Sequence, residues 1–215
     1  VALDRVHQKI KLISLARDSY VFVPEFASFS KLAYSYTWGG AAMAVKNLNY
    51  NYYLNVSDYI AVDFDQLAEI IDRIGGVTVN IDEDEARYLS NYPNVHVGDC
   101  LLDGKTAVSY ARIRKSSATD SDRKRTGRQR EVILSILNTL QTMPLSQYPG
   151  FVRDCLGMCA TSFEAETLLT MAAETLGQNY TVEQYFFPEG QVDWWAGLIK
   201  EYFYYVYDLR RASDR

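Results

Sequence analysis

The residues Tyr59–Ile81, YIAVDFDQLAEIIDRIGGVTVNI, combine the patterns of two strands and one helix. The first six residues are typical of a strand. From Phe64 to Ile74, apolar residues recur at the i, i+3, i+4, i+7 and i+10 spacing of one helix face. Gly75-Gly76 ends that helix, and the last five residues alternate like a second strand. A strand–helix–strand unit of this kind indicates an α/β fold of packed layers.

The N-terminal flank extends this pattern. Val1–Gln8 is typical of a strand end and a turn, and Lys9–Ala16 predicts a second strand whose apolar end suits a sheet covered on both faces. Val21–Ser30, which contains a proline and several aromatics, is expected to be a loop. Residues 41–48 have helical composition. Gly39-Gly40 before them would either let a ligand approach the backbone or form a turn that needs small residues.

The segments that follow the strand predicted at Val77–Ile81 alternate between charged and apolar character. Asp82–Glu85 predicts a solvated acidic turn, and Thr106–Ile113 a passage from helix to strand. Glu131–Met143 is an amphipathic helix pattern, and Glu164–Leu176 a second helix. Tyr185–Pro188 is interpreted as a late strand. The inward positions expected for the amphipathic helix are Val132, Ile133, Ile136, Leu137 and Leu140.

The C-terminal part is rich in aromatic residues. Trp194-Trp195 and Tyr202–Tyr207 are interpreted as helical and are expected to pack on the domain edge. A contact with a partner or with a membrane surface is the alternative.

The whole chain limits the function classes. Its 215 residues suit one compact domain, or one domain with an appendage, and its net charge of −5 argues against a general nucleic-acid binder. No apolar run approaches the roughly 18 residues of a membrane span. Cys100, Cys155 and Cys159 form no C-x-x-C pair, and buried thiols are favoured over a disulfide between the last two. Because the chain starts at Val1 and not at Met, we expect an anchor or export signal upstream.

One stretch is strongly basic, although the chain as a whole is acidic. Residues 111–130 hold eight basic and two acidic residues, a local net charge of +6. If Ser109–Ile113 ends a strand, Arg112 and Arg114 share one face, and the helical spacing after Asp122 places Arg125 and Arg128 on another. Such arginine forks at a helix start could bind one phosphate-like anion. A solvated basic helix or a nucleic-acid patch is the open alternative.

A second candidate lies where the Lys9–Ala16 strand ends. Arg17-Asp18 follows that strand directly, and ligands of α/β sheets gather at strand ends. The two residues could equally form a structural ion pair.

Five motifs, in this order, resemble the LytR-CpsA-Psr family of bacterial envelope proteins over residues 1–140; residues 141–215 correspond to its variable tail. The motifs are R-D-[ST] at Arg17–Ser19, K-[IL]-[NA]-x-A-Y-x-x-G-G at Lys31–Gly40, D-Y-x-x-x-[ND]-F-x(6)-[IV]-D-x-[LI]-G-G-V at Asp58–Val77, L-D-G-x-x-A-L-x-Y-x-R-x-R at Leu102–Arg114, and D-x-D-x-x-R-x-x-R-Q at Asp120–Gln129.

The resemblance implies an α-β-α sandwich with a central mixed sheet and an apolar tunnel for a prenyl chain. It implies a membrane-anchored, extracellular phosphotransferase, as in a Gram-positive bacterium, that attaches a glycopolymer of the teichoic acid or capsular type to peptidoglycan. The donor would be linked to polyprenyl pyrophosphate, and a polyprenyl phosphate would leave. A hydrolase of the same lipid, or a non-catalytic module that binds lipid phosphate or nucleic acid, is the alternative.

The resemblance also assigns roles to residues. Phosphoryl transfer needs charge neutralisation and alignment, which would fall to Arg17, Arg112, Arg114 and Arg125. Asp122 would orient Arg125, join the shell of a Mg²⁺ ion or act as a base; Asp18 would hold Arg17 or touch the metal. In the family an S-D-[TS] strand just upstream adds a metal-binding Asp that this sequence does not include. The residues that would assist by hydrogen bonding are Lys31, Arg128 and Gln129.

Overall fold

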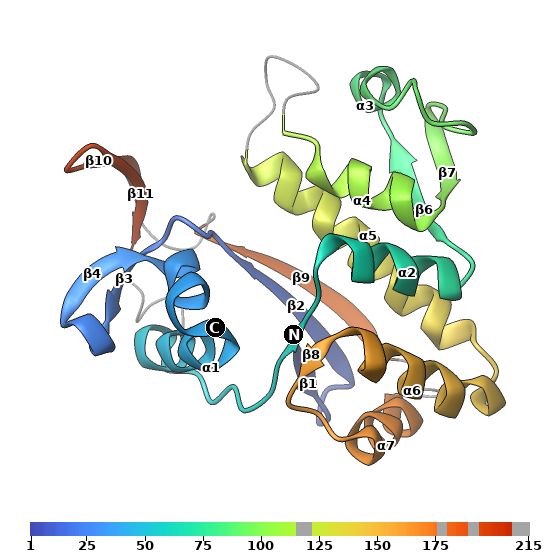
Figure 1. Ribbon diagram of the computed structural model, residues 1–215, viewed down its shortest axis with the longest axis horizontal. Coiled ribbons are helices and arrows are strands. Elements are labelled where there is room, and N and C mark those ends of the chain that lie inside the picture. Colours follow the sequence, from blue (N-terminus) through green and yellow to red (C-terminus); the bar gives the residue numbers. More distant parts are fainter. Residues whose placement is uncertain (115–121, 176–179, 189–193, 208–215) are drawn as a thin grey trace. The chain divides into compact units, whose positions relative to one another are not determined.

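The computed structural model describes residues 1–114, 122–175, 180–188 and 194–207. The chain divides into two compact units, which we describe separately (Figure 1). The first unit contains Val1–Tyr59 and Tyr180–Arg215, and the second contains Ile60–Asn179. The organisation as one domain over residues 1–215 stays a prediction.

A mixed three-stranded sheet forms the base of the first unit. Strand β1 (Ala2–Asp4) pairs antiparallel with β2 (Lys9–Leu15), and β2 pairs parallel with β9 (Thr181–Phe187). The register begins with Lys9 opposite Thr181, and Lys9 Nζ donates to Glu183 Oε1 at 2.5 Å. The predicted strands at residues 9–16 and 185–188 are therefore confirmed, although they come from opposite ends of the sequence.

Two hairpins in the first unit correct the sequence interpretation. Val21–Ser30 is not a loop, because β3 (Tyr20–Val23) and β4 (Ser28–Lys31) pair around the 3₁₀ turn η1 (Pro24–Phe26). The C-terminal aromatic segments are not helical, because β10 (Trp194–Ile199) and β11 (Tyr202–Tyr207) form an antiparallel ribbon. β-branched and aromatic side chains favour strands, where they pack across a pleated surface. That preference decides both segments.

Helix α1 (Leu32–Tyr52) covers the first hairpin and contains a break at the glycine pair. Gly40 has φ +62°, which only glycine adopts easily, and a Cβ on Gly39 would lie 2.6 Å from Met43. The helix predicted for residues 41–48 is thus the second half of α1. Asn51 fixes that half to the hairpin, because its amide oxygen accepts from Phe22 N at 2.9 Å and its amide nitrogen donates to Phe22 O at 2.8 Å.

The predicted strand–helix–strand unit opens the second unit of the structure. A short β5 (Ile60–Ala61) pairs with β8 (Ala160–Thr161), and α2 (Phe64–Arg73) follows. Asp63 and Gln66 form a reciprocal capping box at its start. Gly75 and Gly76 have φ values of +85° and +102°, and they turn the chain into β6 (Val77–Ile81).

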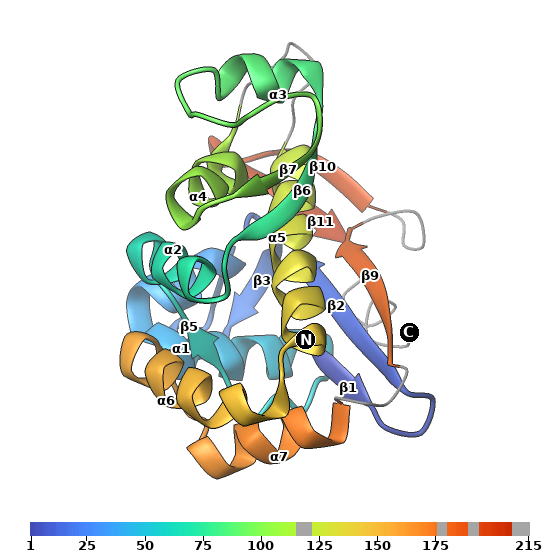
Figure 2. The same cartoon turned by 90° about the vertical axis from the view of Figure 1, so that its right-hand side faces the viewer.

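Strand β6 pairs antiparallel with β7 (Gly98–Leu102), and three helices pack on this ribbon. In Figure 2, α5 (Asp122–Thr142) runs alongside β6. Helix α4 (Gly104–Arg112) crosses α2 so closely that a Cβ on Gly104 would lie 2.0 Å from Ala68 O. The shared core includes the fully buried side chains of Ile71, Val77, Ile81, Ala107 and Ile113.

The sequence interpretation of residues 109–143 is partly wrong. Ser109–Ile113 is not a strand end, because α4 continues to Arg112. Helix α5 begins at Asp122, which confirms the helical spacing predicted from that residue and joins it to the helix predicted for Glu131–Met143. Ile133, predicted to face inward, is 38% exposed.

The remaining elements of the second unit are helical. They are α3 (Glu83–Tyr88), η2 (Leu145–Gln147), α6 (Tyr148–Met158) and α7 (Ala165–Thr175), the last of which confirms the predicted helix. All three cysteines are free thiols, with Cys100 buried and the other two half-buried. None of the described helices combines the length and apolar composition needed to cross a bilayer. The predicted α/β class with a mixed sheet is confirmed.

Candidate functional site

Three of the predicted site residues gather in the first unit. Asp18, in the turn after β2, forms ion pairs with two cations: Lys31 Nζ lies 2.7 Å from Asp18 Oδ1, and Arg17 Nε lies 3.4 Å from Asp18 Oδ2. Lys31 is the last residue of β4 and directly precedes α1, and its ammonium also lies 5.6 Å from the ring centre of Tyr204. Its side chain and that of Asp18 are about 15% exposed, whereas the side chain of Arg17 is 49% exposed. Arg17 is thus the open cation of the group.

A buried hydroxyl network supports the turn. Ser19 Oγ donates to Ala16 O at 2.6 Å and lies 2.9 Å from Tyr207 Oη. Tyr207 Oη in turn lies 2.5 Å from Tyr52 Oη. Burial raises the pKa of both tyrosines, and for Tyr52 the nearby Tyr207 adds to the rise. The network joins the R-D-S motif to α1 and β11 through groups that stay neutral at ordinary pH.

The second unit carries the remaining arginines. Arg112 lies in the last turn of α4, and its guanidinium carbon is 4.4 Å from the ring centre of Phe64, the first residue of α2. Arg114 follows two residues later, and both side chains are exposed. A guanidinium stacked on a ring keeps its edge N–H donors free to bind an anion. The arginines therefore lie near a helix end, and not on one face of a strand as the sequence suggested.

Arg128 has a different environment from the other arginines. Its Nε donates to Glu85 Oε1 at 2.6 Å and its NH1 group to Ile113 O at 3.1 Å, and the side chains of Arg128 and Glu85 are only 3% and 8% exposed. Asp82–Glu85 is therefore not wholly a solvated turn, because Glu85 faces inward. These partners hold α5 to α3 and to the residue between Arg112 and Arg114. A phosphate contact by Arg128 stays a prediction.

The other predicted residues on α5 are Arg125, half-buried, and Gln129, exposed, one turn apart. The helix begins at Asp122, whose side chain lies outside the described part of the structure, as do residues 115–121. Glu131 accepts from the hydroxyl of Tyr110, which ties α5 to α4. Burial raises the pKa of Tyr110, and the Glu131 bond raises it further. Neither Glu85 nor Glu131 was predicted as a site residue, since the sequence shows no sign of their partners on other helices.

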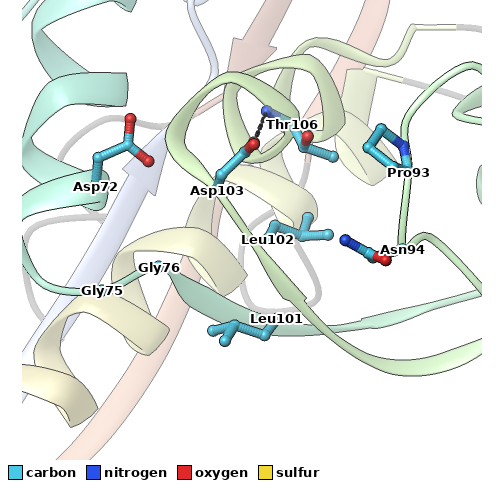
Figure 3. Close-up of a pocket in the computed structure, with 9 residues that line it drawn as sticks. All are labelled: Asp72, Gly75, Gly76, Pro93, Asn94, Leu101, Leu102, Asp103 and Thr106. Carbon is cyan, nitrogen blue, oxygen red and sulfur yellow. Dashed lines mark hydrogen bonds between the residues drawn. The ribbon is translucent and has the colours of Figure 1, made fainter.

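A pocket of about 380 Å³ lies at the opposite end of α4 from Arg112 (Figure 3). Asp72 and Asp103 border it with Thr106, and the carboxylates are already engaged: Asp72 accepts from Gly104 N at 2.6 Å and Asp103 from Thr106 N at 2.8 Å. No Lys or Arg lines it. This chemistry does not suit a pyrophosphate. The full lining is Asp72, Gly75, Gly76, Pro93, Asn94, Leu101, Leu102, Asp103 and Thr106.

The described residues do not form a ready Mg²⁺ site. Within the described ranges, no three His, Cys, Asp or Glu side chains gather as a metal would require. Both oxygens of Asp18 face cations, which compete with a metal for the same lone pairs. Mg²⁺ is usually held by one or two carboxylates together with substrate phosphates and water, so Asp18 could serve as a ligand only if it gave up these ion pairs and the substrate supplied further oxygens.

Comparison with known proteins decides the family. The model of the LytR_cpsA_psr family matches residues 1–214. The chain belongs to the LytR_cpsA_psr family. Its members include proteins named polyisoprenyl-teichoic acid--peptidoglycan teichoic acid transferase TagU: that of Enterococcus faecalis is 30% identical over 132 residues, 61% of this chain and 42% of its own. The Staphylococcus aureus regulatory protein MsrR is 28% identical over 159 residues, 71% of this chain and 47% of its own. The chain thus spans about half the length of the curated relatives it matches.

Solved LytR_cpsA_psr structures share the fold. Crystalline TagT of B. subtilis superposes with a TM-score of 0.77 at 19% identity, covering 99% of this chain and 80% of its own. A protein described as a transcriptional regulator of Enterococcus faecalis gives 0.79 at 23% identity, covering 96% and 74%. The family fold that the sequence implied is therefore confirmed.

Proposed function

We propose that the protein transfers a glycopolymer from a polyprenyl-pyrophosphate carrier to peptidoglycan. The observation that carries the proposal is the family match over residues 1–214, with relatives named as teichoic acid transferases. The solved relative named as TagT bound to LIIa-WTA, with a TM-score of 0.78, supports a teichoic acid as the donor class. Capsular polysaccharide remains within the same chemistry.

The proposed reaction is a displacement at phosphorus. An acceptor hydroxyl of peptidoglycan attacks the phosphorus that carries the glycopolymer, and the bond from that phosphorus to the bridging oxygen breaks. Polyprenyl phosphate leaves with the electron pair of that bond. The hydroxyl proton passes to a base, for which we propose Asp122.

Cationic side chains are proposed to neutralise the negative charge of the pyrophosphate in this step. The exposed guanidinium groups of Arg112 and Arg114, and the half-buried one of Arg125, are proposed to bind phosphate oxygens. The exposed Arg17 and the paired Lys31 are proposed to neutralise further charge, and Gln129 to donate a hydrogen bond. Arg128 is proposed to act chiefly by supporting the Arg112–Arg114 segment, given its buried partners.

A Mg²⁺ ion remains part of the proposal, in which Asp18 would supply one ligand and the phosphate oxygens and water the others. Bound there, the metal would neutralise phosphate charge. The same proposal places the protein on the outer face of a Gram-positive cell membrane, with an anchor upstream of Val1.

The reaction is tested by product analysis. The protein is incubated with a lipid-pyrophosphate-linked teichoic acid precursor, with and without peptidoglycan, and the products are identified by mass spectrometry. We expect polymer–peptidoglycan conjugate and polyprenyl phosphate in equal amounts. Release of polyprenyl phosphate at the same rate without acceptor would identify a hydrolase instead. Arg112→Ala should abolish turnover, whereas Lys105→Gln, an exposed cation at the other end of α4, should retain it.

A further inference from the structure

The β3–β4 hairpin has two unlike faces. In the pairing register, Tyr20 lies opposite Lys31 and Phe22 opposite Phe29, so these four side chains share one face. The other face carries Val21 and Val23, which are fully buried. On the outer face the rings touch, with ring centres 4.9 Å apart for Tyr20–Phe29 and 5.3 Å for Phe22–Phe29.

The β10–β11 ribbon continues this aromatic face. Ser19 forms an isolated parallel bridge with Tyr205 at the junction, and the ring of Tyr204 meets Tyr20 edge-on at 4.9 Å. Tyr202 and Trp195 lie on the same side of the ribbon as Tyr204, by the pairing register and strand alternation. We call the side chains of Tyr20, Phe22, Phe29, Trp195, Tyr202 and Tyr204 the aromatic platform.

The platform is an unusual surface for a protein. Phe29, Trp195 and Tyr202 are 55%, 50% and 58% exposed, and they stand on paired strands that fix their positions. Exposed rings gathered on one face of paired strands are typical of a binding surface. Rings on a strand scaffold lose little conformational entropy when a ligand stacks on them.

Its position points to the occupant. Lys31 ends the same face of the hairpin, and its ammonium contacts both Asp18 and the ring of Tyr204. In the proposed donor, the first sugar is bonded directly to a phosphate. A phosphate near Lys31 would therefore bring the following sugars to the neighbouring rings. The C–H faces of sugars stack on aromatic rings, while tyrosine hydroxyls can bond sugar hydroxyls.

A membrane surface fits the platform less well. Interfacial protein surfaces combine aromatic residues with basic side chains that attract anionic lipids. Here the cation at the platform, Lys31, is paired with Asp18 at 2.7 Å, and the whole chain carries a net charge of −5. Aromatic rings therefore outnumber cations on this face.

We propose that the aromatic platform binds successive sugar rings of the glycopolymer, beginning from the phosphate end at Lys31. The proposal rests on the proposed transferase function. It deepens that function by assigning the polymer its own binding surface on the two hairpins.

The two neighbouring tryptophans of β10 provide a matched test. Trp195 is on the platform, whereas Trp194 is on the opposite side of the ribbon and equally exposed at 49%. Lipid-free teichoic acid is titrated by calorimetry against the wild type, Trp195→Ala and Trp194→Ala. We expect Trp195→Ala to weaken binding about tenfold and Trp194→Ala to change it less than twofold. Equal losses in both variants, or no binding by the folded wild type, would overturn the proposal.

A second measurement separates the alternatives. Co-sedimentation with phosphatidylglycerol–phosphatidylcholine vesicles is measured for the same three proteins. If only Trp195→Ala loses vesicle binding, and it still binds teichoic acid like the wild type, the platform is a membrane-binding surface and the proposal is overturned. Because binding is read without turnover, failure of the transfer reaction leaves this result intact. If transfer occurs, Trp195→Ala should raise KM for a long polymer donor and leave KM for a single-sugar donor unchanged. Equal increases for both donors would count against a polymer-binding surface.

Discussion

Arg128 and Glu85 form an ion pair with 2.6 Å between Nε and Oε1, and their side chains are almost completely buried. A second guanidinium nitrogen donates to the carbonyl of Ile113, whose sequence neighbours are Arg112 and Arg114. An acid on α3 therefore fixes an arginine on α5, which fixes the backbone between two candidate phosphate ligands. The pair links the stability of the second unit to the placement of its exposed cations.

Removing one charge of this pair should destabilise the protein strongly. Glu85→Gln leaves the guanidinium of Arg128 buried without its counter-charge, and breaking such a pair costs about 3 kcal/mol. The free energy of unfolding in urea measures the loss. Asp84→Asn is the matched control, because Asp84 pairs with a largely exposed Arg87, and its expected cost is under about 0.5 kcal/mol. A loss below about 1 kcal/mol for Glu85→Gln would show that water reaches the guanidinium.

This ion pair could not be predicted from the sequence. A run of four acids is usually solvated, and nothing near Glu85 in the sequence signals a partner on another helix. Local signals were sufficient for α2, since its apolar period, its capping residue and its terminal glycines all agree. Ser109–Ile113 lacked such agreement, and in the structure α4 continues through this segment to Arg112.

The candidate site followed a similar pattern. The Arg17–Asp18 pair could be anticipated, because the strand end and the charged motif are visible in the sequence, whereas the ion pair of Asp18 with Lys31 was not predicted. The ring of Phe64 beneath Arg112 could not, because it depends on how two helices meet. Tyr207 near the C-terminus, which completes the hydroxyl network of Ser19, could not be anticipated either, since that contact depends on a ribbon whose strand character was misjudged.

The buried tyrosine pair predicts a loss of stability at alkaline pH. Tyr52 has a raised pKa in the folded protein, so the folded state retains a proton that the unfolded state releases above about pH 10. The contribution of Tyr52 to the free energy of unfolding is thus complete below that pH, and it declines as the pH rises toward the pKa of Tyr52 in the folded protein. Urea midpoints at pH 8 and pH 11 measure it. Tyr52→Phe should flatten the decline, and Tyr88→Phe, at a 53% exposed position, should not.

The cap of α4 predicts an acid effect of opposite sign. Hydrogen bonds from Thr106 lower the pKa of Asp103, so its contribution is present above the unfolded value near 4 and is lost as the pH falls below it. Asp103→Ala should cost about 1 kcal/mol at pH 7 by unfolding in urea. Asp103→Asn keeps a capping oxygen, so it should stay near wild-type stability while losing part of the acid dependence. If this variant lost stability at low pH as the wild type does, other carboxyl groups would account for that loss.

The thiol of Cys155 should react slowly in the folded protein. Burial raises its pKa to about 11, two units above the usual value of 9.0, and the neighbouring Cys159 contributes. Because the thiolate is the nucleophile, alkylation by iodoacetamide at pH 8 should be roughly a hundredfold slower than in urea. Peptide mass spectrometry resolves each site. Full labelling of all three cysteines in urea is expected, and a Cys155–Cys159 disulfide would instead leave both unlabelled until reduction.

The stacking of Arg112 on Phe64 predicts that a positive charge alone at position 112 does not give full pyrophosphate binding. Arg112→Lys keeps the positive charge but loses the planar fork and most of the stacking, so binding of geranyl pyrophosphate, followed by calorimetry, should weaken about tenfold. Phe64→Leu should weaken it less, by about threefold, because the guanidinium remains but its orientation is freer. Lys105→Gln serves as the charge control, with an expected change below twofold. The combined Arg112→Lys, Phe64→Leu variant decides the mechanism. If the ring acts by orienting the guanidinium, the second substitution adds little to the first, whereas full additivity would mean that Phe64 contacts the ligand independently.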